Sequence, residues 1–202
     1  LDGTAAGFSV YAGPKDDANL VEYAKGSCRV SVGRSITLAN KAIVYPFNHP
    51  TNGAAVVFSA QNVTVGTNAA FKAERAGYDY CYGPGACYAH HLSGKGGEGN
   101  GASYGGINSR WHADDNYLEQ PTYGNAYAPF WAGSPGTYQS DGGLPGGGAI
   151  ILEVSRQLTL YGRLDADASA DSVSAGLGSG GSVWVKAKRI KIDGGSAKIT
   201  AK

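Results

Sequence analysis

Two carboxylates, Asp165 and Asp167, stand at alternate positions of a predicted strand, and Asp171 follows them. Alternate residues of a strand point to the same face, so these two side chains are expected to lie together. Paired carboxylates can hydrolyse glycosidic bonds or bind calcium. However, Lys202 occupies the position that matches Asp167 in a later copy of the repeat described below, and the pair falls in the outward-facing phase. We therefore interpret the pair as a solvated face.

Histidines form a second candidate site. His90 and His91 are adjacent, and His112 lies near Asp114 and Asp115. Imidazole and carboxylate groups suit divalent metals, but adjacent residues of an extended chain point to opposite sides and rarely reach one ion. We expect solvated loops here and no metal site. The chain also lacks a Ser-His-Asp order, a zinc-ligand spacing and a phosphate or dinucleotide motif, so we predict no enzyme, no catalytic residue and no cofactor.

The cysteines indicate the redox compartment in which the protein folds. Cys81 and Cys87 flank a Pro-Gly turn, which favours a small disulfide loop, since no other Cys or His pair has zinc-ligand spacing. A disulfide indicates an oxidising compartment. We expect Cys28 to be buried and inert, with pairing to another chain as the alternative. Asn62 begins an Asn-Val-Thr triplet, an acceptor for N-glycosylation. Together these features predict an extracellular or cell-surface glycoprotein.

Aromatic residues gather in a glycine-rich stretch, residues 74–147. Tyr and Trp side chains on a rigid scaffold suit contacts with carbohydrate or protein. The alternative is that they only pack this stretch onto the rest of the domain. Glycine runs between them favour ordered loops or extended polyglycine-like segments in which backbones approach closely. The candidate binding surface consists of Trp111, Trp131, Tyr117, Tyr123 and Tyr127.

Composition limits the fold and the partners. The chain has 202 residues and a net charge of +1, which gives no reason to expect nucleic acid as a partner. No apolar run reaches the roughly 18 residues of a membrane helix, so we expect no membrane insertion. With 32 glycines, the glycine content is about twice the usual ~7%. Glycine disfavours long helices, so we expect strands joined by turns.

The elements that must position these side chains repeat along the chain. Four segments, 28–44, 55–73, 148–166 and 181–201, each contain two alternating apolar-polar runs, a turn and a third short run. Equivalent leucine and isoleucine positions lie about 30 residues apart, a spacing typical of stacked repeats. We predict two interior columns of stacked side chains. The first holds Val63, Leu158 and Ile190, and the second holds Phe71, Leu164 and Ile199.

The predicted fold is all-β, a parallel β-helix (β-solenoid) of about four three-strand rungs with one long glycine- and aromatic-rich insertion. An antiparallel sandwich is the alternative. We divide this single domain into an N-terminal segment at 1–25, first rungs at 26–73, the insertion at 74–147 and last rungs at 148–202. A flat ice-binding face is not expected, because the sequence shows no regular threonine ladder.

One motif has a known counterpart. Glycine clusters at 99–106 and 142–148 are followed by Gly-Ser-Gly-Gly-Ser-Val-Trp-Val at 178–185. From about residue 78 to residue 202 the chain resembles the glycine-rich repeat units of large secreted or cell-surface proteins of protists, algae and bacteria. The resemblance implies an extracellular scaffold, surface filament or adhesin. It brings no catalytic residues.

These observations lead to a functional expectation. Unpaired strand edges at the two ends of such a stack invite pairing with another chain, and a head-to-tail contact propagates into a filament. We therefore expect a structural subunit of an extracellular filament or surface assembly, a homopolymer whose partners are copies of itself. The first alternative is a surface adhesin or carbohydrate-binding module that binds glycans or other surface proteins. The second is a polysaccharide-degrading enzyme.

Overall fold

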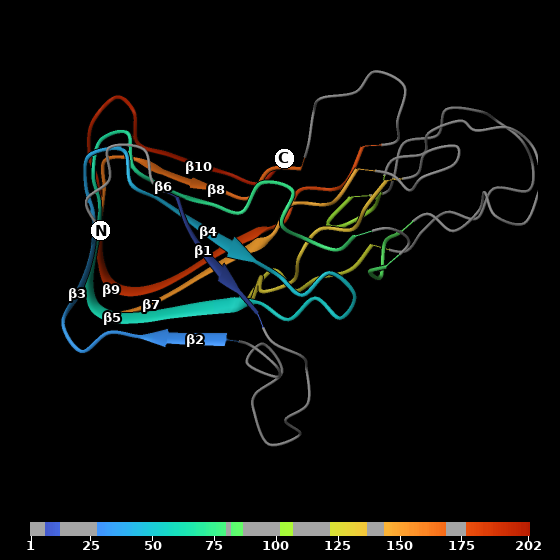
Figure 1. The fold of residues 1–202 in the computed structure, drawn as a ribbon, viewed down its shortest axis with the longest axis horizontal. Helices are drawn as coiled ribbons and strands as arrows, with labels where there is room; N and C mark the ends of the chain where they lie inside the picture. Colours follow the sequence, from blue (N-terminus) through green and yellow to red (C-terminus); the bar gives the residue numbers. More distant parts are fainter. Residues whose placement is uncertain are drawn as a thin grey trace, which may run out of the picture.

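A computed structural model describes residues 7–12, 28–79, 82–86, 102–106, 122–136, 144–168 and 177–202. These residues form ten strands and no helix, so this part of the chain has no helix that is long and apolar enough to cross a membrane (Figure 1). The strands are β1 (Gly7–Tyr11), β2 (Cys28–Ser31), β3 (Ser35–Leu38), β4 (Ile43–Phe47), β5 (Val56–Val65), β6 (Ala70–Lys72), β7 (Ala149–Leu160), β8 (Arg163–Asp165), β9 (Ser182–Ile192) and β10 (Lys198–Thr200).

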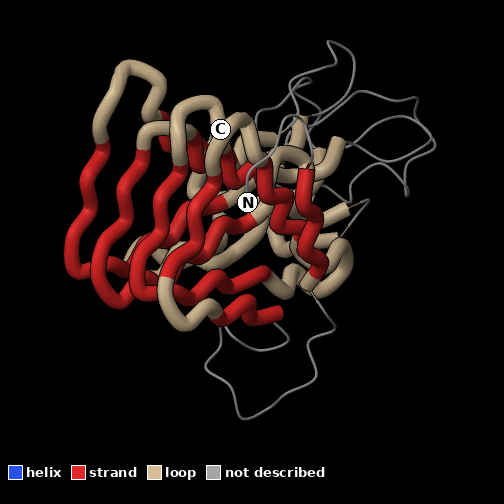
Figure 2. Tube along the Cα trace, turned by 60° about the vertical axis from the view of Figure 1, so that its left-hand side comes forward, coloured by secondary structure: helices blue, strands red, loops and turns tan. Residues whose placement is uncertain are grey.

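The strands form two parallel sheets. The first sheet has the order β1-β4-β6-β8-β10. The second has the order β2-β5-β7-β9, with β3 also paired to β5. From β4 onward the chain alternates between the two sheets, which places strands from successive repeats side by side (Figure 2). Parallel sheets usually belong to α/β proteins, in which helices cover the faces, but the described residues contain no helix.

The predicted β-solenoid of about four three-strand rungs is therefore wrong, because the strands divide into two separate sheets. In three of the four repeats the first two runs join into one long strand, namely β5, β7 or β9. The predicted break is only a shift of register, between Ala60 and Asn62 in β5 and between Val154 and Gln157 in β7. Such irregularities bend a strand without ending it. The antiparallel alternative is also wrong, since every described strand pair is parallel.

The predicted register of both apolar columns is confirmed, although their last members, Ile190 and Ile199, are exposed rather than interior. Val63 pairs with Leu158 and Leu158 with Ile190 in the second sheet. Phe71 pairs with Leu164 and Leu164 with Ile199 in the first sheet. The inner members are fully buried, because period-two alternation turns them toward the space between the sheets. Phe58 adds an edge-to-face contact with Phe71, at 5.1 Å between ring centroids.

Candidate functional site

Many of the predicted site residues lie outside the described residues. Among the described residues, no group of three or more His, Cys, Asp or Glu side chains could hold a metal ion. Cys28, at the start of β2, is half-buried against the core rather than fully buried. The predicted residues outside the described ranges are Cys81, Cys87, His90, His91, Trp111, His112, Asp114, Asp115, Tyr117 and Asp171.

The carboxylates of Asp165 and Asp167 accept hydrogen bonds from backbone groups. Asp165 Oδ1 accepts from the Asp167 amide at 3.2 Å, and Asp167 Oδ1 accepts from the Lys202 amide at 2.8 Å. Lys72 lies in the same hollow as Asp165. Its pKa is raised, first by a hydrogen bond to Glu74 and to a smaller extent by the charge of Asp165. Asp167 thus links the chain after β8 to the chain after β10 on the outer face of the first sheet, whereas the Asp165 bond is local.

Four segments that each contain glycine pack beside the sheets, at residues 76–78, 132–134, 145–148 and 178–181 (Figure 1). The Gly77 amide donates to the Gly146 carbonyl at 2.9 Å, and the Gly133 amide donates to the Gly147 carbonyl at 2.7 Å. The Gly147 amide donates in turn to Ser179 at 2.9 Å. Each segment therefore forms backbone hydrogen bonds to more than one of the others, so the four segments form a bundle and not a flat sheet. We call this arrangement the glycine bundle. A Cβ on Gly133 would overlap the Ser179 carbonyl oxygen, and one on Gly147 would overlap the Ala166 carbonyl oxygen, so these positions require glycine.

Two tyrosines are fixed against the glycine bundle. Tyr123 donates to the Ala132 carbonyl at 2.7 Å and accepts from the Ser134 hydroxyl at 2.8 Å. Tyr104 donates to the Trp131 carbonyl at 3.3 Å and packs edge-to-face on Tyr123, with centroids 4.7 Å apart. Burial raises the pKa of both phenols above the usual value of 10.0. Both hydroxyls therefore remain protonated, and able to donate, throughout the neutral range.

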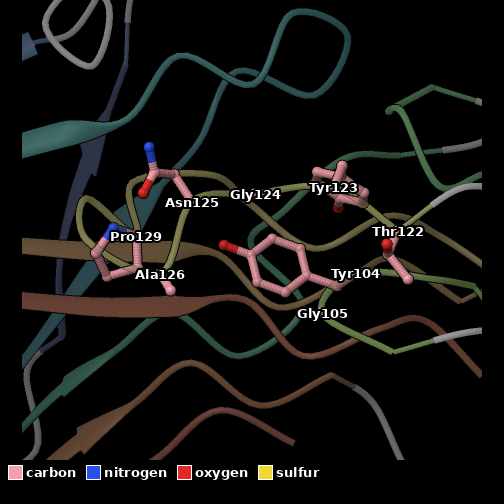
Figure 3. A pocket seen from close by; sticks show the side chains of 8 residues that line it. All are labelled: Tyr104, Gly105, Thr122, Tyr123, Gly124, Asn125, Ala126 and Pro129. Atoms are coloured by element: carbon pink, nitrogen blue, oxygen red, sulfur yellow. The ribbon is translucent and has the colours of Figure 1, made fainter.

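An open pocket of about 330 Å³ lies over the Tyr104 ring. Figure 3 shows this ring between Asn125 on one side and Thr122 on the other. Gly124 adopts a left-handed conformation with φ of 95°, and a Cβ placed there would lie 3.2 Å from the Tyr104 ring. The described lining is Tyr104, Gly105, Thr122, Tyr123, Gly124, Asn125, Ala126 and Pro129.

The structure separates the predicted aromatic surface into residues with different roles. Tyr123 lines the pocket, whereas Trp131 supplies the carbonyl that holds Tyr104 and stacks on Phe130. Phe130 packs against the second sheet. Tyr127 is 96% exposed and does not line this pocket. Aromatic residues of this stretch thus both attach it to the sheet and form a pocket.

Sequence reasoning missed the central pocket residue, Tyr104, and its polar neighbours Thr122 and Asn125. One sequence signal could have indicated Tyr104. Tyr104, like Tyr123, is followed by glycine in the sequence. In the structure, the Tyr104 ring packs against Gly124 and the Tyr123 ring packs against Gly85.

The outer face of the second sheet carries a short threonine ladder, which was not expected from the sequence. Thr37, Thr64 and Thr159 are in register on β3, β5 and β7. Lys191 on β9 replaces threonine at the next step. Asn62, the predicted glycosylation acceptor, is half-buried in the neighbouring column, between Ser35 and Gln157.

Both sheets end on open edges. On β9 and β10, Ile190 and Ile199 are 53% and 45% exposed, although they continue columns whose inner members are fully buried. On β1, at the opposite edge of the first sheet, Phe8 is 51% exposed and pairs with Val44. The apolar space between the sheets is therefore uncovered at both ends of the described stack.

Comparison of the chain with family models, with curated proteins and with solved structures finds no match.

Proposed function

We propose that this protein is a structural subunit that assembles head to tail with copies of itself through the open edges of its sheets, in an extracellular filament or surface assembly. The observation that carries the proposal is the column of the first sheet. It runs from Phe8 through Val44, Phe71 and Leu164 to Ile199, buried in the middle and exposed at both ends. Covering apolar surface of this kind with a partner lowers the free energy of the system.

The two exposed ends of this column match one another. If β10 of one copy pairs with β1 of the next in the same register, Ile199 meets Phe8, and Thr200 meets Ser9. Neither strand has a second neighbour among the described strands, so each offers an edge at which another strand can pair. Because the surface of β10 differs from that of β1, the contact between copies is heterologous. It adds copies into an open filament unless the rotation between successive copies closes a ring.

The edge of the second sheet is less suited to pairing. The outer positions of β9 carry Lys186, Arg189 and Lys191, and Lys188 is also exposed. Lysine-rich edge strands resist indiscriminate strand addition. At the opposite end of the stack, the first sheet extends to β1, and no described strand of the second sheet lies at the level of β1. Strand pairing between copies therefore takes place mainly in the first sheet. The basic edge of β9 disfavours pairing with other strands.

Sedimentation velocity over two decades of protein concentration tests the proposal. We expect the protein to form larger species as its concentration rises, and Ile199→Lys or Phe8→Lys alone to abolish this association, because each places a charge in the contact. A mixture of the two variants should form dimers and nothing larger, since each variant keeps one intact edge. Tyr127→Lys, at an exposed residue away from both edges, should assemble like the unmodified protein. A monomer at every concentration would overturn the proposal.

A further inference from the structure

The pocket over Tyr104 has the size and the surface of a small-molecule site. Its volume of about 330 Å³ lies at the lower end of the range for ligand pockets. The eight lining residues that the structure describes are all uncharged. A phosphate, a carboxylate or an ammonium group would find no counter-charge among them, so the surface suits a neutral ligand.

The floor of the pocket is an aromatic ring held in place before any ligand binds. The Tyr104 hydroxyl is bonded to the Trp131 carbonyl, and its ring rests edge-to-face on Tyr123. Tyr123 is itself fixed by two hydrogen bonds to the glycine bundle. A ring that is already ordered loses little conformational entropy on binding, which favours affinity from a small contact area.

The rim of the pocket is polar. Thr122 and Asn125 are exposed at its two sides (Figure 3). The Asn125 Oδ1 atom accepts from the Tyr127 amide at 2.8 Å, which orients this side chain. A hydroxyl and an amide can exchange hydrogen bonds with ligand hydroxyls, as donors and as acceptors.

We propose that this pocket binds one pyranose ring of a neutral glycan. A pyranose combines an apolar face of C–H groups, which would lie on Tyr104, with equatorial hydroxyls that reach Thr122 and Asn125. It carries no charge, in agreement with the uncharged residues of the described lining. The open mouth admits the terminal ring of a longer chain as well as a free sugar. This site is separate from the sheet edges, so it neither requires nor replaces self-assembly.

Saturation-transfer difference NMR tests the site, with methyl β-glucopyranoside, methyl β-galactopyranoside and methyl α-mannopyranoside as probes. We expect transfer to at least one of them, strongest at the protons of one ring face. Methyl β-glucuronide, which has the same ring with a carboxylate, should bind more weakly than the glucoside. Absence of transfer to all three neutral glycosides would overturn the proposal.

Variants locate the binding. Tyr104→Ala should weaken it about tenfold or more, whereas Tyr104→Phe, which keeps the ring and its contact with Tyr123 but loses the bond to the Trp131 carbonyl, should weaken it far less. Tyr127→Ala removes an exposed aromatic ring outside the pocket and serves as the matched control. If Tyr104→Ala does not fold, Ala126→Trp fills the pocket from an exposed position and should block binding. Unchanged transfer in a folded Tyr104→Ala or Ala126→Trp protein would show that the sugar binds elsewhere.

Discussion

Replacing Gly147 by alanine is expected to lower the free energy of unfolding by about 3 kcal/mol or more, at the upper end of what overpacking costs. A Cβ at this position would overlap the carbonyl oxygen of Ala166 and lie 2.6 Å from the amide nitrogen of Gly181. Both are backbone atoms, so no change of rotamer relieves the overlap. Relief requires segments of the glycine bundle to move apart, which breaks hydrogen bonds such as that from Gly147 to Ser179.

Urea unfolding followed by circular dichroism measures this effect. Gly106→Ala and Gly195→Ala are matched controls, because a Cβ at either position meets no heavy atom within 4 Å. These controls should change the free energy of unfolding by less than about 0.5 kcal/mol. If Gly147→Ala is as stable as the controls, the backbones of the glycine bundle are not packed closely enough to exclude a Cβ.

Leu158→Ala is expected to lower the free energy of unfolding by about 2–5 kcal/mol, the usual cost of a cavity in a packed core. Leu158 is fully buried between Val63 and Ile190 in one column of the second sheet. Neighbours on both sides keep the cavity from collapsing, so the lost contacts are not replaced.

Ile190→Ala provides the matched control for Leu158→Ala. It removes a side chain of the same volume from the next position of the same column, but this side chain is 53% exposed. We expect a loss below about 1 kcal/mol, measured on the monomer at low concentration, since about half of its surface already contacts water. Equal losses for the two variants would mean that β9 does not form an open edge in solution.

The interior columns could be predicted because their signal is local. Alternation of apolar and polar residues fixes which side chains face inward, and matched spacing between repeats fixes which of them pair. Leu158 and Ile190 therefore fell into register as expected. The two-sheet arrangement could not be predicted in this way. The polar residues near Gln61 and Arg156 have the composition of a turn, but the chain passes through them as irregularities within one strand.

The glycine bundle and the pocket depend on contacts between distant segments. The glycine clusters indicate where backbones can come close, but not that Gly133 meets Gly147 or that Gly77 meets Gly146. The same limit applies to Tyr104. Its environment is set by Tyr123 and by the Trp131 carbonyl, which lie 19 and 27 residues away in the sequence. No periodic pattern connects such positions.

Disulfide trapping between copies tests the proposed assembly most directly. In a chain carrying both Phe8→Cys and Ile199→Cys, the two thiols would lie on paired strands of neighbouring copies, at a strand spacing of about 4.8 Å that suits a disulfide. Oxidation should then give a ladder of covalent multimers on a non-reducing gel. The unmodified protein and a Ser9→Cys, Ile199→Cys chain should not form this ladder, because Ser9 points to the opposite face of β1. Covalent monomers alone from the first chain, or equal ladders from all three, would contradict head-to-tail assembly through the first sheet.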